Sequence, residues 1–374
     1  MIIERIDIFH VCNPCRISYK TSFGVNNAFD SLLVKFISGE YTGWGEAAAG
    51  GFPGFSPEYA EVSFITGRKF LVPLILGKDI GSGDELQNIF SIYRGNQFAK
   101  AAFDMAWWNL YSQMKGKPLY KVIGGIRDEV SAGTAIGVLD SLDKLMEQID
   151  KLVKSGFPRI KLKYSPGWEL EMIAAVRSCF PNLIMHIDCN AAYTLADMDM
   201  FKKLDKYNLA MIEQPLSHDD LIDHAELQSK ISTPICLDES ITSPEKARKA
   251  VGIGACKFVN IKHGRIGGIT NALKINKICA DGGVSCWIGG MGESSLGVNT
   301  GISLATLPNI IYPSDITPSE KFYEKDLCAP ITDNPHPGIF RPRQIPGIGS
   351  VPDPEQLAKV SLNKFSTSAD KRNI

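Results

Sequence analysis

The 374-residue chain has almost no net charge, no long apolar run and no organised set of cysteines. Its 40 basic and 41 acidic residues nearly balance, and no basic stripe interleaved with aromatic residues occurs, so we expect no nucleic-acid partner. No apolar stretch has the length of a membrane span, so we expect no membrane association. The first residues lack a basic segment followed by an apolar one, and we therefore expect a cytoplasmic protein.

The nine cysteines are odd in number and scattered, which argues against a disulfide framework. Cys12 and Cys15 have the spacing of half a zinc site or of a redox pair. No second pair completes a zinc site, and the Asn13-Pro14 dipeptide between them does not open a helix as a redox motif would. We expect ordinary reduced thiols and no zinc.

Residues 1–125 have the pattern of an α+β unit. Strands are predicted over residues 2–11, 30–37 and 41–47, with Ser38-Gly39-Glu40 as a hairpin turn between the last two. Residues 50–55 are rich in glycine and proline and predict a mobile loop. The apolar spacing over residues 99–114 is helical.

Residues 126–315 alternate short β-branched runs with amphipathic helices, which indicates a parallel sheet with crossover helices. Eight such units favour closure into a (β/α)₈ barrel of the TIM type over an open sheet. The tail, residues 316–374, is rich in proline and glycine, and we expect it to pack back on the N-terminal unit. The predicted strands span residues 131–138, 159–164, 183–190, 209–214, 235–239, 258–262, 284–288 and 309–312.

Ionisable residues recur at a nearly constant interval along these strands. Lys163, Asp188, Glu213 and Asp238 are each 25 residues apart, and Lys262 follows 24 residues later. Each lies at or near the C-terminal end of a predicted strand, and barrel enzymes build their active sites on that face. A single acidic residue after a strand is more often a helix N-cap, but five groups in register predict a shared site.

Three carboxylates that meet at a dry barrel mouth repel one another unless a cation neutralises them. Oxygen ligands favour a hard divalent cation, and three carboxylates leave octahedral positions open for water or substrate. We therefore expect Asp188, Glu213 and Asp238 to bind Mg²⁺, for which Mn²⁺ is an alternative.

Charged and aliphatic residues alternate over residues 159–163. Because side chains alternate along a strand, Lys161 and Lys163 share a face, and Ile160 and Leu162 point outward to the covering helices. An exposed edge strand would give the same pattern, but the helices of a parallel barrel cover its outer face. A desolvated lysine near another cation has a lowered pKa and can remove a proton, so one lysine, aided by the charge of Lys161, is predicted to abstract the α-proton of a carboxylate bound to the metal.

Three weaker signals surround this group. Asn190 faces the same way as Asp188 and is expected to orient a metal ligand or a lysine. The Gly289-Gly290-Met291-Gly292 run lacks the lysine and spacing of a phosphate-binding loop, so we expect Gly290 and Met291 to let the backbone approach the substrate. Glu239 either hydrogen-bonds around the site or caps a helix.

These residues together resemble the muconate-lactonizing subgroup of the enolase superfamily: Lys161-Leu162-Lys163, Asp188-Cys189-Asn190, Glu213, Leu237-Asp238-Glu239-Ser240 and Lys262. The resemblance includes residues 101–110 and Gly124-Gly125 and covers essentially the whole chain. It implies a capping domain over residues 1–125, a barrel over 126–315 and a C-terminal segment over 316–374. It also implies Asp188, Glu213 and Asp238 as Mg²⁺ ligands, Lys163 and Lys262 as the acid–base pair, and Lys161 as the support for the substrate carboxylate.

Residues 19–24, 43–46, 55–59, 289–294 and 318–323 resemble the o-succinylbenzoate synthase branch, which overlaps with N-acylamino acid racemases. That likeness implies a lyase of menaquinone biosynthesis with a small carboxylate substrate, capping loops near residues 18–25 and 50–55, and a homo-oligomer. N-acylamino acid racemase, dipeptide epimerase and muconate cycloisomerase stay open because the same residues serve them. An inactive barrel that only binds is opposed by the intact charged set, and a sugar-acid dehydratase is opposed by Lys262.

Overall fold

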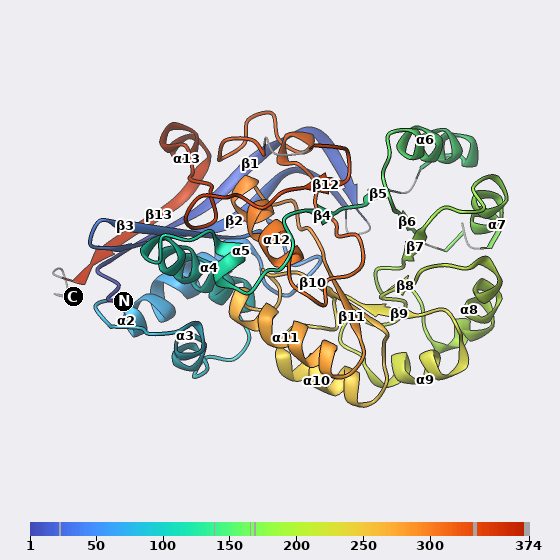
Figure 1. Cartoon of the computed structure of the whole chain (residues 1–374), viewed down its shortest axis with the longest axis horizontal. Coiled ribbons are helices and arrows are strands. Elements are labelled where there is room, and N and C mark those ends of the chain that lie inside the picture. Colours follow the sequence, from blue (N-terminus) through green and yellow to red (C-terminus); the bar gives the residue numbers. More distant parts are fainter. Residues whose placement is uncertain (22–23, 138, 165, 168–169, 332–334, 370–374) are drawn as a thin grey trace.

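The computed structural model describes residues 1–21, 24–137, 139–164, 166–167, 170–331 and 335–369, and it has two lobes (Figure 1). An antiparallel sheet with its helices forms one lobe, and a parallel β/α barrel forms the other. Throughout these ranges, every helix lacks either the length or the apolar character needed to cross a membrane. The nine cysteines are all free thiols.

The antiparallel sheet contains the predicted N-terminal hairpin. Its strands are β1 (Arg5–Thr21), β2 (Gly24–Ser38) and β3 (Tyr41–Ala47), and β13 (Ser361–Ser368) pairs with β1 to give the order β13-β1-β2-β3. Gly39 has a φ of 56°, a conformation that glycine adopts without strain, which explains the tight turn between β2 and β3. The strand β13 thus joins the C-terminal part of the chain to its first strand. The domain boundaries given above stay predictions.

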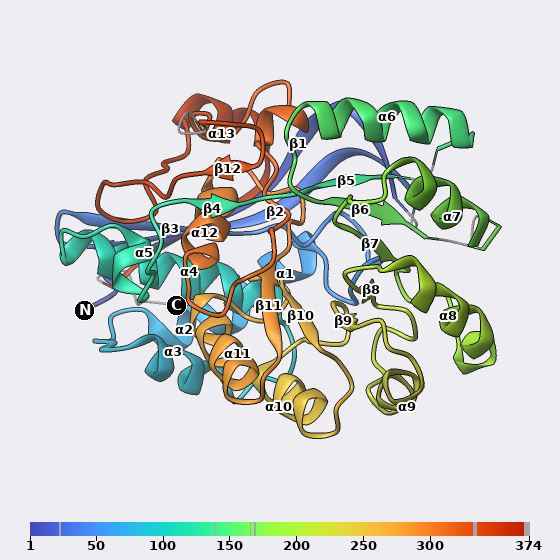
Figure 2. The same cartoon turned by 45° about the vertical axis from the view of Figure 1, so that its right-hand side comes forward.

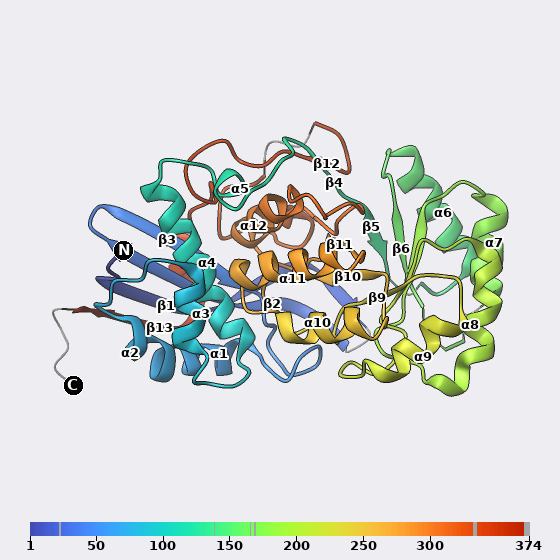
Figure 3. The same ribbon diagram turned by 60° about the horizontal axis from the view of Figure 1, so that its bottom comes forward.

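Helix α4 (Gln97–Met114) confirms the predicted helix over residues 99–114. It packs against β3 on one side and approaches α11 on the other (Figure 3). A side chain at Gly43 or Gly45 would collide with the α4 backbone, so these glycines permit the close contact. The other helices of this lobe are α1 (Ala60–Thr66), the π-helical turn η1 (Gly67–Leu71), α2 (Val72–Ile75), α3 (Gly83–Phe90) and α5 (Leu119–Val122).

Within the described residues, seven parallel strands form the barrel sheet in sequence order. They are β5 (Thr134–Ile136), β6 (Ile160–Lys163), β7 (Met185–Asp188), β8 (Ile212–Glu213), β9 (Ile235–Leu237), β10 (Phe258–Ile261) and β11 (Ser285–Ile288). Beside them, β4 (Val130–Ser131) pairs with β12 (Ile339–Phe340).

The prediction of a regular eighth strand over residues 309–312 is wrong. Among the described residues, this segment pairs with Cys286 through an isolated parallel bridge at Ile310, and a second isolated bridge joins Ser314, two residues beyond the segment, to Ala132. Pro308 and Pro313 flank it, and a proline cannot donate to a strand ladder, so a continuous strand does not form there. Because the bridges reach β11 on one side and the residues before β5 on the other, the segment still closes the barrel.

Helices cover the outside of the barrel (Figure 2). Ser141 and Ser243 begin two of them, each accepting a hydrogen bond from the backbone N–H three residues later. The helices are α6 (Leu142–Lys154), α7 (Leu170–Cys179), α8 (Met198–Leu204), α9 (Ile222–Lys230), α10 (Pro244–Gly252), α11 (Ile269–Asp281) and α12 (Ser295–Ala305), with α13 (Pro354–Val360) near the C-terminus. The short turns are η2 (Leu195–Asp197), η3 (Asp205–Tyr207) and η4 (Ser319–Lys321).

A buried carboxylate joins the two lobes at the start of α12, a helix that is buried along its whole length. Glu46 on β3 accepts hydrogen bonds from the backbone amides of Ser294 and Gly297, and from the hydroxyls of Ser31 and Ser294. A negative charge is favourable at a helix N-terminus. Glu46 therefore holds the capping sheet against the barrel.

This junction gives a pH-dependence prediction. Burial raises the pKa of Glu46 to about 7, although the bonds from Ser294 lower it. Between pH 4.5 and about 7 the folded protein keeps a proton that the unfolded chain releases, so this group makes the free energy of unfolding fall as the pH rises through that window. Denaturant unfolding from pH 4 to 8 should show a smaller fall in Glu46→Gln than in the wild type. Identical slopes in the two proteins would contradict the prediction.

Candidate functional site

The regularly spaced charged residues meet at the carboxyl end of the barrel sheet. Lys163 on β6 lies opposite Asp188 on β7, and Asp188 lies opposite Glu213 on β8. Asp238 and Lys262 directly follow β9 and β10. The predicted gathering of these groups on one face is thus confirmed in the structure.

The lysines of β6 also point as predicted. Ile160 and Leu162 are buried on the helix-covered side, whereas the ammonium group of Lys161 lies 3.4 Å from carboxylate oxygens of both Asp188 and Glu213. Burial lowers the pKa of Lys161, but the surrounding carboxylates outweigh it and raise the pKa well above its usual value. Lys161 therefore stays a fixed positive charge on the floor of the site.

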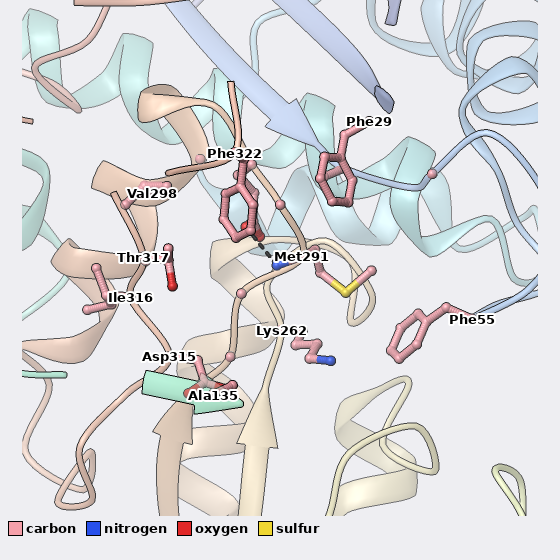
Figure 4. Close-up of a pocket in the computed structure, with 18 of the residues that line it drawn as sticks. Phe29, Phe55, Ala135, Lys262, Met291, Val298, Asp315, Ile316, Thr317 and Phe322 are labelled. Atoms are coloured by element: carbon pink, nitrogen blue, oxygen red, sulfur yellow. Dashed lines mark hydrogen bonds between the residues drawn. The ribbon is translucent and has the colours of Figure 1, made fainter. Parts of the chain in front are cut away.

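A cavity of about 240 Å³ opens above these strand ends. Lys161, Lys163, Asp188 and Lys262 are among the residues that line it, and Figure 4 shows Phe29 and Phe322 on the side away from Asp315. Further apolar lining comes from residues including Phe55, Met291, Val298 and Ile316. The predicted position of residues 50–55 at the barrel mouth is confirmed by Gly50, Gly51, Phe52 and Phe55, whereas Ser22 and Phe23 of the other predicted loop lie outside the described residues. The cavity suits a small, largely apolar molecule with an anionic group.

Lys163 and Lys262 hold two different carboxylates. The Nζ atom of Lys163 lies 2.8 Å from Oδ2 of Asp188, and that of Lys262 lies 2.8 Å from Oδ2 of Asp238. The ring of Phe55 covers the Lys262 ammonium at 4.4 Å from its centroid. Since β6 and β10 are separated by the three strands that lead to the carboxylates, the two lysines approach the cavity from different sides.

The expected lowering of the lysine pKa is not found at Lys163. Burial lowers the pKa of Lys163, but the adjacent Asp188 carboxylate raises it by more, so the net pKa lies above its usual value. A cation on Asp188 would compete for the same negative charge and would lower the pKa of Lys163, against the direction set by Asp188. The proton-accepting form of Lys163 therefore depends on what else Asp188 binds.

Two observations show that the carboxylates fit a divalent cation: the charge state of Glu213 and the surroundings of its Oε2 atom. Burial and the charges of Asp188 and Asp238 raise the pKa of Glu213 to about 8, although Lys161 lowers it. Its Oε2 atom is buried without a hydrogen-bond partner in the described part of the chain. Asn260 donates to the other oxygen, Oε1, at 2.7 Å and fixes the carboxylate. An additional positive charge would satisfy this oxygen and allow all three carboxylates to ionise.

The side chains are not already arranged as a metal cage. Across the described residues, no three carboxylate, thiol or imidazole groups are grouped closely enough to hold a metal ion. The oxygens are engaged by cations of the chain instead: Lys163 on Asp188, and both Lys262 and Arg265 on Asp238. Metal binding would require these ion pairs to rearrange.

The secondary residues occupy the predicted surroundings. Asn190 accepts from Lys163 through Oδ1 and donates through Nδ2 to Glu239 at 3.1 Å, which fixes the orientation of its amide. Gly290 and Met291 line the cavity, and the backbone N–H of Met291 donates to Glu293. A side chain on Gly290 would approach the backbone oxygen of Asp315 to 2.9 Å, so glycine permits this close packing.

Sequence reasoning missed Arg159, Arg265, Glu293 and Asp315. Arg265 pairs with Asp238 and lies three residues after Lys262. Its direction could not be predicted, because the residues between them belong to a loop with no repeating pattern. Asp315 follows the segment that closes the barrel. A carboxylate at that strand end was detectable in principle, but the predicted strand ended too early, at residue 312.

Two family models match most of the chain. "Mandelate racemase / muconate lactonizing enzyme, N-terminal domain" matches residues 5–124, and "Enolase C-terminal domain-like" matches residues 144–356. The chain is 39% identical to an o-succinylbenzoate synthase from Geobacillus kaustophilus, covering 96% of this chain and 95% of the relative. It is 36% identical to an N-succinylamino acid racemase from Thermus thermophilus, covering 87% and 89%.

The fold agrees with a solved structure. The crystal structure of a member of the enolase superfamily from Listeria innocua superposes with a TM-score of 0.94 at 33% identity, covering 99% of this chain and all of that chain. The barrel with its N-terminal capping lobe is therefore the architecture of that protein as well.

Proposed function

The chain belongs to the enolase superfamily, and we propose that it catalyses Mg²⁺-dependent removal of a proton α to a carboxylate, in the dehydration that forms o-succinylbenzoate. The pairing of a lysine base with Mg²⁺ is an established property of the superfamily. The observation that carries the proposal is the placement of Lys163 and Lys262 at one cavity, on either side of the strands that bear Asp188, Glu213 and Asp238.

Each lysine of the site has a separate role in the proposed reaction. Lys161 supplies a permanent positive charge for the substrate carboxylate, and neutral Lys163 accepts the α-proton at Nζ. The same ammonium then returns the proton to the departing hydroxyl, which leaves as water. Lys262 holds its charge opposite Lys163 and offsets the negative charge that develops in the substrate. Phe55, Met291 and Phe322 limit the access of water to the reacting atoms.

Asp188, Glu213 and Asp238 would hold Mg²⁺, which supplies, when bound, a positive charge that offsets the charge developing on the substrate carboxylate. The Oε2 atom of Glu213 supports this assignment because it is buried without a hydrogen-bond partner among the described residues. We expect chelation to abolish activity and added Mg²⁺ to restore it.

Mg²⁺ binding should also be visible without substrate. A ligand that binds only the folded protein raises its stability, so saturating Mg²⁺ should raise the Tm of the wild type. Glu213→Gln replaces a carboxylate oxygen by an amide donor and removes the negative charge, so its Tm should respond to Mg²⁺ far less. Exposed Glu245→Gln on α10 is the matched control. An unchanged response in Glu213→Gln would remove Glu213 from the metal site.

N-acylamino acid racemisation is the second candidate. It is favoured by the two lysines on different sides of the cavity, since a racemase must move protons on both faces of one carbon. It is also supported by the Thermus thermophilus relative, whose name is N-succinylamino acid racemase. Both reactions begin with the same proton abstraction.

The deciding experiment is a Mg²⁺-dependent assay with the cyclohexadiene carboxylate precursor of o-succinylbenzoate, followed by product absorbance. Racemisation of N-succinyl amino acids is measured in parallel. We expect rapid dehydration. Racemisation alone would move the substrate to an acylamino acid, and neither activity despite Mg²⁺ binding would favour a barrel that only binds a carboxylate.

A further inference from the structure

Three carboxylates of the described residues lie within 4 Å of the Lys161 ammonium. Asp188 and Glu213 are each 3.4 Å away, whereas Oδ2 of Asp315 is 2.7 Å away. The closest partner of Lys161 is therefore the one that lies outside the group assigned to the metal. Coulomb attraction rises as the separation falls, and it is strong in a site where the ammonium is buried.

Asp315 is held firmly at the end of the segment that closes the barrel. Its backbone N–H donates to the carbonyl of Ile288 at 2.8 Å. The fully buried guanidinium of Arg159 lies 2.6 Å from Oδ1 of Asp315 and also donates to the carbonyl of Pro313. Arg159 thus ties the carboxylate and its backbone to the start of β6, the strand that carries Lys161.

The carboxylate also faces the cavity. Asp315 lines it, and 14% of its side chain is exposed. Figure 4 shows Asp315 near the ends of the barrel strands, away from Phe29 and Phe322. Burial raises the pKa of Asp315, but Arg159 and Lys161 outweigh burial and hold the pKa below its usual range. Asp315 is accordingly a charged partner for Lys161 at neutral pH.

Without Asp315, the remaining anionic partners of Lys161 would be Asp188 and Glu213. The ammonium would then move closer to these carboxylates and close its present 3.4 Å separation from Oε2 of Glu213, an oxygen that has no hydrogen-bond partner among the described residues. A lysine in that position competes with a cation for the same oxygens. It also leaves the place where it would meet the carboxylate of a substrate.

We propose that Asp315 is a positioning residue that holds Lys161 back from Asp188 and Glu213, so that these carboxylates stay available to a divalent cation and the ammonium stays available to the substrate. The inference rests on the proposed function. It predicts that loss of Asp315 weakens metal binding through Lys161, although Asp315 itself is not assigned as a metal ligand.

The test measures Mg²⁺ affinity by titration calorimetry, without substrate, in the wild type, Asp315→Asn, Lys161→Met and the double variant. We expect Asp315→Asn to bind Mg²⁺ about 10–100-fold more weakly, the usual effect of losing a residue that supports a metal site. With Lys161 absent, the same substitution should have little effect, because no ammonium remains to be misplaced. Equal effects in both backgrounds would show that Asp315 acts by its own charge and would overturn the proposal.

Asp315→Glu distinguishes the effect of the carboxylate's position from the effect of its charge. It also provides a second test if Asp315→Asn does not fold. It keeps the negative charge one methylene further along, so its Mg²⁺ affinity should fall below that of the wild type. An affinity equal to that of the wild type would contradict the inference. In turnover, Asp315→Asn should show a raised KM for the carboxylate substrate at saturating Mg²⁺.

The outcomes also distinguish this inference from the proposed function. A wild type that binds Mg²⁺ and turns over substrate, with Asp315→Asn binding Mg²⁺ equally well, overturns the role of Asp315 alone. A wild type that does not bind Mg²⁺ overturns the proposed function and the inference that rests on it.

Discussion

Lys163→Ala should abolish turnover while leaving the fold and Mg²⁺ binding intact. A positioned general base contributes about 10²–10⁴-fold to the rate, so kcat should fall by at least that factor. Lys163 also neutralises Asp188 at 2.8 Å, and its removal leaves that carboxylate with fewer cationic partners. Mg²⁺ affinity should therefore be kept or increased, which separates loss of the base from loss of the site. Steady-state kinetics and calorimetric Mg²⁺ titration of the same protein check both parts.

The matched control for this variant is Lys154→Ala. Lys154 lies at the end of α6 with 74% of its side chain exposed, and within the described part of the chain its ion pair is with Asp150. Surface ion pairs of this kind contribute little, so its kinetics should equal those of the wild type. Substantial activity in Lys163→Ala would eliminate Lys163 as the base.

Lys262→Arg should separate dehydration from racemisation. Arginine keeps the positive charge and can keep a cation–π contact with Phe55 like that of Lys262, but it is not deprotonated in proteins. Dehydration needs only the charge at this position and should retain part of its rate. Racemisation needs Lys262 to exchange a proton and should lose about 10²–10⁴-fold, the contribution of general acid–base catalysis. Both rates are measured on one preparation.

Lys262→Ala provides the comparison because it removes the charge as well. The Asp238 carboxylate would then keep Arg265 but lose its contact with Lys262, and both activities should fall. Equal losses of dehydration and racemisation in Lys262→Arg would show that the two reactions use Lys262 in the same way, and the distinction between them would fail.

The course of the chain through the barrel was predictable from local pattern. Alternating strands and helices recur at a near-constant interval, and each repeat advances the chain by one strand. That is why the spacing of Lys163, Asp188, Glu213 and Asp238 predicted their shared face without any knowledge of their contacts. Side-chain alternation along a strand likewise predicted the inward direction of Lys161 and the outward direction of Ile160.

Contacts between remote segments were not predictable in this way. Proline on both sides of residues 309–312 turned the eighth strand into isolated bridges, and its actual end placed Asp315 beside Lys161. Arg159 looked like one more charge of an alternating strand, yet it is buried against that closing segment. Phe29 and Phe55 reach the cavity from the other lobe. The sequence pattern around these two residues does not indicate any contact with the barrel.

The sequence by itself determined the fold class, the shared face of the charged residues and their chemical type, because strand and helix periodicity is a local property that repeats. Only the tertiary structure decided which cation pairs with which carboxylate. It brought Asp315 to Lys161 and Arg265 to Asp238, and it placed Lys163 where Asp188 raises its pKa. Among the described residues it also left Oε2 of Glu213 without a hydrogen-bond partner. Those properties depend on distances of a few ångströms between segments far apart in the chain, and Coulomb energies and burial costs at such distances are not encoded in any local pattern.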